Sequence, residues 1–280
     1  MRTLCLALLL LVPAVSGASD ISFGGVSLVI PNPNGFRPVT QKMSLLYDLQ
    51  KQFVAPGNEE FVAFIPERDV PAALEGDLPD SPRRFTVQTA KSLIGVSVST
   101  SDFAKLKNIV KSQNNDLMEK VERQLPGLSK KMNQGITKKY DFDLALSVSE
   151  MVLMPVHEET DRTLAYSALT KYDMKDENGK PAPFVAAVTA TFVHVRGKVL
   201  FLYSHAEESG LEWSKGVSQQ WANAVVAANQ SDLEASVKES SPSAVSGIDW
   251  GRVGAKAVAG AVIGLLIGLI VWAINRSKAR

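Results

Sequence analysis

Residues 184–205, which read FVAAVTATFVHVRGKVLFLYSH, decide the fold of this chain. Two runs of apolar and β-branched residues flank Arg196-Gly197, and a two-residue turn between such runs is typical of a β-hairpin. With this turn, Val195 faces Lys198 and His205 falls opposite Val188. The segment therefore predicts two long antiparallel strands joined by a tight turn.

Further elements can be placed around this hairpin from the spacing of apolar residues. Strands are expected at residues 27–30, 60–65, 84–89, 94–99, 144–156 and 164–174. Helices are expected at residues 44–53 and from Ser101 to about Leu125, where Pro126-Gly127 stops or kinks the chain. Strands joined by short turns, with helices before, between and after them, predict an α+β fold in which helices cover a mainly antiparallel sheet.

The last helix of this body is expected to follow the hairpin directly. The pattern Ser209-x-x-Glu212 is typical of a capping box, which satisfies free backbone N–H groups at the start of a helix. The residues expected on its buried side are Leu211, Val217, Trp221, Ala224 and Val225. The predicted body therefore runs from residue 19 to residue 230.

A loose motif adds to this order of elements near the N-terminus. The first strand ends at Ile30 and Pro31, and Asn34-Gly35-Phe36 follow as a Pro-x-Gly-aromatic turn. With the strand pairs and the late hairpin followed by a helix, this arrangement resembles the PsbP-type fold. The resemblance implies an exported accessory protein, and no catalytic residue carries over because that family has no common catalytic motif.

Both ends of the chain carry membrane signals. Residues 1–18 combine Arg2, an apolar run and a small-residue cleavage site, which is typical of a secretory signal peptide. Residues 257–274 read AVAGAVIGLLIGLIVWAI without a charge. A helix needs about 20 apolar residues to cross a bilayer, so residues 250–275 are predicted to be one transmembrane helix. Trp250 and Trp272 would anchor it at the two interfaces.

Three glycines recur at every fourth position of this membrane segment: Gly260, Gly264 and Gly268. On a helix they form a smooth stripe that allows close packing against a second helix. The stripe therefore predicts a homo-oligomer or a contact with another membrane protein. The alternative is that glycine is simply frequent in membrane helices.

The two signals together predict the cellular location and the membrane topology of the protein. Export of the N-terminus and one later span place the body in the periplasm and the basic tail, residues 276–280, in the cytoplasm. The only cysteine, Cys5, leaves with the signal peptide, and a cysteine-free exported body suits the inner membrane of a bacterium. Residues 231–249, rich in serine and acidic residues, are predicted to be a flexible linker. The glycosylation sequon at Asn229 is expected to go unused.

The sequence contains no pattern that predicts catalysis, a metal site or a cofactor. His194 and His205 share a face of the hairpin but lie about 20 Å apart, too far to share a metal. Their expected roles are ring packing and a local hydrogen bond. His157 begins a zinc-protease-like motif, but Asp161 stands where the second histidine is needed. The net charge of +1 gives no pull toward nucleic acid.

One basic surface stands out between the expected long helix and the next strand. It contains Lys130, Lys131, Lys138 and Lys139, and we expect either contact with anionic lipid or an acidic partner, or an ordinary solvated helix. The leading hypothesis is a membrane-anchored periplasmic binding or scaffolding protein without catalysis. The alternatives are an envelope hydrolase whose site is not visible in the sequence and a domain that binds a small molecule or lipid.

Overall fold

The predicted hairpin forms the centre of the structure, a computed structural model that describes residues 17–52, 54–55, 57–79, 81–112, 127, 130, 147–175 and 179–230. Strands β9 (Phe184–Val195) and β10 (Lys198–Glu207) pair in the expected register, with Val195 opposite Lys198 and His205 opposite Val188. Arg196 and Gly197 both have positive φ, 48° and 70°, as the twisted two-residue turn of a hairpin requires. The hairpin prediction is thus confirmed.

Within the described residues, the main sheet has eight strands in the order β3-β4-β5-β10-β9-β8-β6, with β7 beside β8. All of its pairs are antiparallel. Its other strands are β3 (Phe36–Pro38), β4 (Asn58–Pro66), β5 (Arg84–Ala90), β6 (Ser147–Leu153), β7 (Glu158–Glu159) and β8 (Thr163–Asp173). A separate antiparallel pair consists of β1 (Ala18–Phe23) and β2 (Val26–Pro31). The α+β class and the mainly antiparallel sheet are therefore confirmed.

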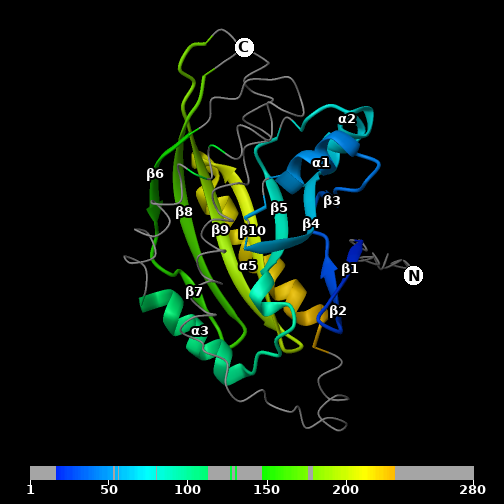
Figure 1. Cartoon of the computed structure of the whole chain (residues 1–280), viewed down its shortest axis with the longest axis vertical. Helices are drawn as coiled ribbons and strands as arrows, with labels where there is room; N and C mark the ends of the chain where they lie inside the picture. The colour runs from blue at the N-terminus through cyan, green and yellow to red at the C-terminus, as the bar shows by residue number, and fades with distance from the viewer. Residues whose placement is uncertain are drawn as a thin grey trace, which may run out of the picture.

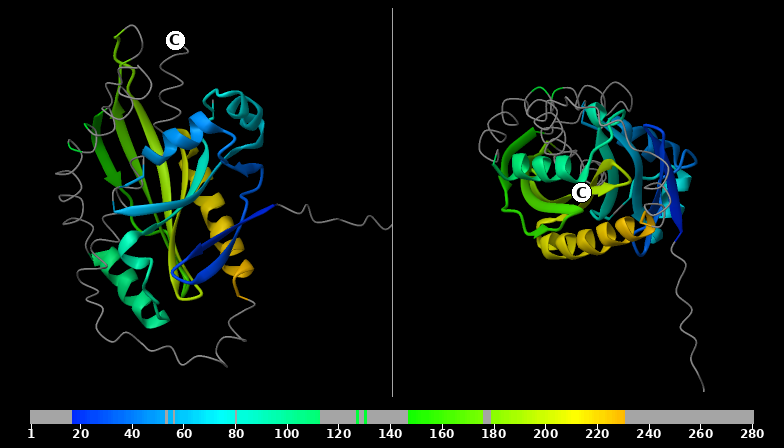
Figure 2. Two further views of the ribbon diagram at one scale, coloured as in Figure 1. Left: turned by 45° about the vertical axis from the view of Figure 1, so that its right-hand side comes forward. Right: turned by 90° about the horizontal axis from the view of Figure 1, so that it is seen from below.

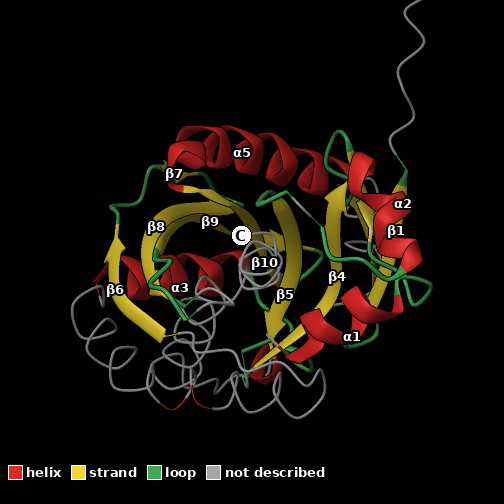
Figure 3. Ribbon diagram, turned by 90° about the horizontal axis from the view of Figure 1, so that it is seen from above, coloured by secondary structure: helices red, strands yellow, loops and turns green. Residues whose placement is uncertain are grey.

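Helices lie on both sides of this sheet. They are α1 (Ser44–Gln52), α2 (Val70–Glu75), α3 (Thr100–Ser112) and α5 (Leu211–Ala228), with short 3-10 turns at Glu67–Asp69, Lys91–Leu93 and Glu208–Gly210. The long strands β8, β9 and β10 stand side by side (Figure 1) and curve strongly, so that α5 lies along the convex face while α3 lies on the concave side (Figures 2 and 3). The sheet is thus covered on two faces.

Alternate residues of β10 show how the two cores are divided. Leu200 and Leu202 point to the convex face, where they pack with Trp221 of α5 and with the β1–β2 pair. Phe201 and Tyr203 point to the concave face, where they pack with residues of α1 and α3. Because side chains alternate along a strand, each buried strand supplies both cores.

The β1–β2 pair is fastened to the end of α5 by side-chain bonds to its backbone. Asn229, the residue after the helix, accepts from Val29 N at 2.9 Å and donates to Val29 O at 2.8 Å. Trp221 Nε1 donates to Pro31 O at 2.8 Å. Asn229 is only 5% exposed, so its sequon is closed to a glycosyl transferase in the folded domain.

Two local predictions are wrong. Residues 94–99 form no strand, because side chains take their carbonyl groups: Lys198 Nζ donates to Ile94 O and Val96 O, both at 3.0 Å. The capping box at Ser209 does not form either, since a 3-10 turn precedes the helix and Gly210 stands at the N-cap without a side-chain bond.

Two of the residues expected on the buried side of α5, Trp221 and Val225, are buried there, but Ala224 is exposed. Leu211 and Val217 are only partly buried. The other buried positions of the helix are small: Ser214, Ser218 and Ala222.

Candidate functional site on the concave face

The polar residues of the concave face gather on β4, β5 and β10. Arg84 of β5 pairs with His205 of β10, and Thr86 pairs with Tyr203. Gln88, the next residue on the same face of β5, pairs with Glu60 of β4. Cross-strand partners share one face of a sheet, so these side chains lie together on the side where Tyr203 packs.

The burial of this polar row does not follow from the sequence pattern alone. Alternation of polar and apolar residues in β5 is typical of a strand with one face in solvent. Instead, Thr86 is 1% exposed and Gln88 is 4% exposed. A buried polar group without a hydrogen bond costs free energy, so the partners of each group in this row matter.

Amide side chains order the Glu60 end of the row. Asn58 Nδ2 donates to Gln88 Oε1 at 2.9 Å, and Gln88 Nε2 donates to Glu60 Oε2 at 3.3 Å. Burial raises the pKa of the Glu60 carboxyl, against the opposing charge of Arg84 and the bond from Gln88. The Glu60 carboxyl is therefore fixed in position and shifted toward its neutral form.

His205 is the least satisfied group of the site. It is 1% exposed, and neither of its ring nitrogens has a hydrogen-bond partner in the part of the chain that the structure describes. Burial lowers the pKa of His205 well below its ordinary value, and the nearby charge of Arg84 lowers it further. At neutral pH the ring is therefore uncharged, with one N–H to donate and one lone pair to accept.

Three hydroxyl groups on the same face are also buried without partners among the described residues: those of Thr86, Tyr166 and Thr170. Thr86 lies opposite Tyr203, Tyr203 opposite Ala190, and Ala190 opposite Tyr166. The row thus runs across four strands, with the small side chain of Ala190 between the two tyrosines. Such groups are rare in folded proteins and call for a specific explanation.

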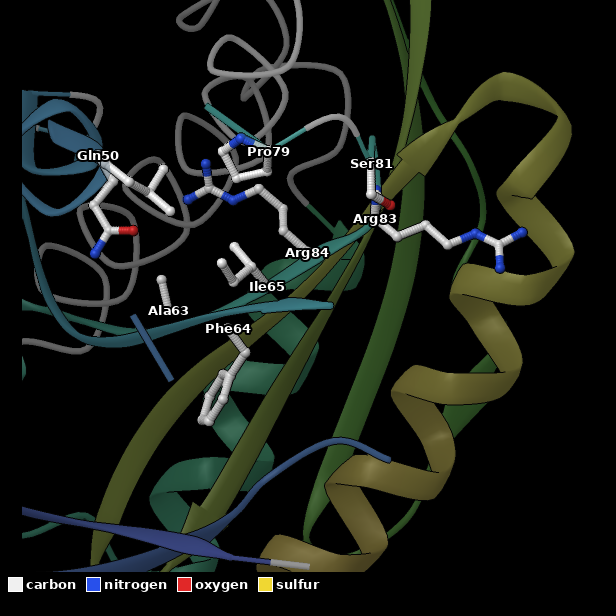
Figure 4. Close-up of a pocket in the computed structure, with 9 residues that line it drawn as sticks. Gln50, Ala63, Phe64, Ile65, Pro79, Ser81, Arg83 and Arg84 are labelled. Carbon is white, nitrogen blue, oxygen red and sulfur yellow. Dashed lines mark hydrogen bonds between the residues drawn. The ribbon is translucent and has the colours of Figure 1, made fainter. Parts of the chain in front are cut away.

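Arg84 supplies the positive charge of the site. Its side chain extends over Ile65 toward Gln50 and Pro79, while the neighbouring Arg83 points the other way, toward α5 (Figure 4). Arg83 lies over the Trp213 ring at 4.5 Å. Arg84 is half-buried, and burial lowers its pKa while the charge of Glu60 raises it. It lines a cavity of about 10 Å³, room for one water-sized atom, with Gln50 and Ser81.

A second polar cluster lies under α5 on the convex face, and its geometry is structural. His157 Nε2 is 3.1 Å from Ser167 Oγ, which is a spacing that a nucleophile and its base would adopt. Ser167 is fully buried, however, and its hydroxyl also bonds Thr189 at 2.9 Å. The Ser167 hydroxyl is therefore engaged by two protein side chains. The chain of hydroxyls continues through Ser214, Ser204 and Ser218 and joins helix to sheet.

The other residues singled out from the sequence have mixed outcomes. His194 behaves as expected: its Nε2 lies 2.7 Å from Val98 O and its ring stacks on Phe103. For His205 the expected ring packing is found, since its ring centroid lies 6.1 Å from that of Tyr203, but neither ring nitrogen has a hydrogen-bond partner among the described residues. The described residues contain no group of three or more His, Cys, Asp or Glu able to hold a metal.

The membrane-segment residues Gly260, Gly264, Gly268, Trp250 and Trp272 lie outside the described residues. Among the helices that are described, none is both long and apolar enough to cross a membrane. Of the basic surface, Lys130 is helical and exposed, whereas Lys131, Lys138 and Lys139 lie outside the described residues. The membrane helix, its glycine stripe and the basic surface therefore stay predictions.

Comparison with known proteins adds little to this description. No family profile matches the chain, and no curated protein matches it either. The solution structure of the cyanobacterial PsbP protein CyanoP from Synechocystis sp. PCC 6803 is similar over 77% of this chain and 93% of that chain, with 11% identity and a TM-score of 0.29. PA94 from Pseudomonas aeruginosa, a protein of unknown function, is similar over 72% of this chain and 92% of that one, with 10% identity and a TM-score of 0.18. At such scores the PsbP-type resemblance is weak, and the fold described above rests on its own strands and helices.

Proposed function

We propose that this chain is a non-enzymatic binding protein of the bacterial cell envelope, which holds a small-molecule ligand against the concave face of its sheet. The observation that carries the proposal is a set of buried polar groups on that face without hydrogen-bond partners among the described residues, which includes groups of His205, Tyr166 and Thr86. Leaving each of these groups unbonded costs about 1–3 kcal/mol. A ligand that bonds to them removes this cost, so a binding site explains why polar residues occupy the positions.

The cellular location of the protein is part of the same proposal. The signal peptide at residues 1–18 and the apolar segment at residues 250–275 support a periplasmic body anchored in the inner membrane. The Ser-rich linker at residues 231–249 supports a domain that moves freely above the bilayer. The Gly260, Gly264 and Gly268 stripe supports self-association or a contact with another membrane helix. These features make the ligand-binding domain a membrane-tethered receptor or scaffold.

The ligand-binding part can be tested by native mass spectrometry of the full chain, extracted from membranes in a mild detergent. We expect wild-type protein to retain a bound small molecule and a His205→Phe variant to lose it. A His194→Phe variant is the matched control, because His194 lies on the same face but already has its partner in Val98 O. Wild-type protein without any bound molecule, or equal retention by the two variants, would contradict the proposal.

The membrane anchoring and the topology can be tested separately in cells. We expect the chain to stay in the membrane fraction during alkaline carbonate extraction, and its body to be digested by protease added to spheroplasts. Loss of residues 250–275 should release the body into the periplasmic fraction. A body protected from protease in intact spheroplasts would contradict the predicted topology, without bearing on the ligand site.

A further inference from the structure

We infer that the body pairs with a second copy of itself through strand β6, so that the main sheets of the two copies join edge to edge across a two-fold axis at Val152. This interface lies outside the polar row of the concave face and does not depend on the ligand proposed above. Three observations lead to it: the position of β6 in the sheet, the direction of its backbone groups and the side chains along the strand.

Strand β6 forms one of the two edges of the main sheet (Figures 1 and 3). Among the described strands it pairs with β8 on one side and has no neighbour on the other. The opposite edge is β3 (Phe36–Pro38), and an edge strand that is very short and contains proline is protected against pairing with another chain. Strand β6 has seven residues and no proline. It is therefore the edge of this sheet that offers a template for a further strand.

The backbone of β6 presents hydrogen-bonding groups to this edge at defined positions. Met154 N donates to Ser167 O of β8 at 2.8 Å, so the backbone groups of Met154 point into the sheet. In an antiparallel pair, the backbone groups of successive residues alternate in direction. Leu153 and Met151 therefore point their N–H and C=O groups outward, while Val152 points inward. The described residues supply no partner for these outward groups.

A two-fold axis at Val152 satisfies these outward groups. Met151 of one copy then lies opposite Leu153 of the other, and each such pair exchanges both of its N–H···O bonds. Val152 lies opposite Val152 of the second copy in the closer, non-hydrogen-bonded position, where side chains make contact. Val152 is 49% exposed in the single body. The pairing therefore covers an apolar side chain that one copy alone leaves in solvent.

The charges along the edge fit a second copy. Glu150 is the only charged residue of β6. An axis at Val152 places Glu150 opposite Met154 of the second copy, so that like charges do not meet across the interface. A register shift between Val148 and Glu150 interrupts the regular ladder at this point. The pairing is thus confined to residues 150–154, which are self-complementary.

Membrane tethering would compensate for the small size of this contact. A pair over residues 150–154 buries much less than the roughly 1,200 Å² of a stable interface. The chain leaves the body at the end of α5 and continues into the predicted linker and membrane helix, whose glycine stripe is expected to bring copies together. Linked partners reach effective concentrations in the millimolar range, at which a weak edge contact forms.

Disulfide trapping of the full chain, in membranes from the cells that express it, tests the pairing. Cys5 is the only cysteine, so each variant is made with Cys5→Ser and carries one cysteine. Val152→Cys is the test variant. Val29→Cys is the matched control, because Val29 is also an exposed strand valine, 37% exposed, but belongs to β2.

Two further variants test the register. Glu150→Cys and Met154→Cys face each other across the proposed axis when the two variants are co-expressed. In either variant alone, the two cysteines lie four residues apart along the ladder, which is about 13 Å and beyond the reach of a disulfide.

We expect Val152→Cys to form at least about 10-fold more disulfide dimer than Val29→Cys on mild oxidation, because directly opposed residues have the Cα separation that a disulfide spans. Glu150→Cys and Met154→Cys should each form little dimer alone, and co-expression should produce the mixed dimer. The mixed pair also serves as the test if Val152→Cys fails to fold.

Three outcomes would overturn the inference. Equal dimer from Val152→Cys and Val29→Cys would show chance collision, and equal dimer from Val152→Cys and from Glu150→Cys alone would show contact without the proposed register. A Val152→Cys adduct with a different protein in place of the dimer, identified by mass spectrometry, would assign the edge to another partner. Each of these outcomes leaves the ligand site, which is tested at His205, unaffected.

Discussion

Replacing His205 by phenylalanine should make the ligand-free protein more stable and should abolish binding of the proposed ligand. In the folded state the imidazole is 1% exposed and both nitrogens lack partners among the described residues. An apolar ring removes that unsatisfied polarity and keeps the contact with Tyr203, whose ring centroid lies 6.1 Å from that of His205. Most core substitutions destabilise, so a gain at this position would be diagnostic of a site kept for binding.

The size of the gain follows from two opposing effects. Each unbonded buried donor or acceptor costs about 1–3 kcal/mol. Phenylalanine adds one ring atom, and overpacking a dense core costs about 1–3 kcal/mol. With two nitrogens relieved and one atom added, the expected net change is a gain of about 1–2 kcal/mol in the free energy of unfolding at neutral pH.

The control is the same substitution at His194. That residue is also buried and on the concave face, but its Nε2 bonds Val98 O at 2.7 Å. His194→Phe leaves that carbonyl unbonded, at a cost of about 1–3 kcal/mol, but it also removes the unpartnered Nδ1, so no net gain in stability is expected. The two free energies of unfolding can be compared in urea, with the full chain in the same detergent. If both variants lose stability by similar amounts, the reasoning about unpartnered nitrogens is wrong.

The pH dependence of the free energy of unfolding tests the burial of the same histidine, His205, independently. An unfolded histidine has a pKa near 6.5, whereas burial holds the folded pKa of His205 well below that value. Below about pH 6.5 the unfolded state binds more protons, so stability falls as pH falls toward the folded pKa. Between about pH 7 and pH 5, His205 should account for a loss of up to about 2 kcal/mol.

His205→Phe should remove that part of the pH dependence. His194 acts in the same direction, and Glu60, whose folded pKa is raised, acts in the opposite one. Because wild type and variant share both groups, the difference between their pH profiles isolates His205 and its neighbour Arg84. Parallel profiles for the two proteins would refute the claim that His205 is buried in its neutral form.

Three further predictions concern packing. Gly24 has φ of 54° and a Cβ there would overlap Ile94 O, whereas Gly25 has φ of 76° and nothing within 4 Å of an added Cβ. Gly24→Ala should therefore lose about 2 kcal/mol more stability in urea than Gly25→Ala, and equal losses would contradict the close approach. Trp221→Ala should lose about 3–5 kcal/mol, measured by thermal melting, because the ring packs on Phe64 and Phe85 and its N–H bonds Pro31 O. Gly264→Ile should reduce self-association in a membrane two-hybrid assay, since a branched side chain separates the helices; an unchanged signal would rule out the glycine stripe as an interface.

The sequence predicted the parts of the fold that local rules control. The Arg196-Gly197 turn sets the register of the hairpin because two positive φ angles close the loop in only one way. The strands rich in β-branched and aromatic residues could also be predicted, because these residue types favour strands locally. Residues 94–99 have the same alternation, but their carbonyls bond to Lys198 and His194 rather than to a strand, which only the tertiary fold decides.

The candidate site could not be predicted from such local rules. Arg84 and His205 are far apart in the sequence and meet because β5 pairs with β10, a pairing that no local pattern indicates. The polar face of β5 is typical of solvent exposure, yet the curvature of the sheet places it inside. One signal was present: His205 ends a strand that otherwise reads as core, and an ionisable residue within such a strand indicates a special role.

The Asn229 bonds to Val29 give the domain a defined mechanical loading point. Residue 231 begins the chain that leads toward the C-terminus, so a pull on that chain reaches the fold one residue beyond Asn229. The two bonds at 2.9 and 2.8 Å join the end of α5 to the strand β2. Tension would reach β2 through these bonds, and it would reach the main sheet through the packing of α5 on β9 and β10. The end of α5 is thus the point at which a force on the chain divides between the β1–β2 pair and the main sheet.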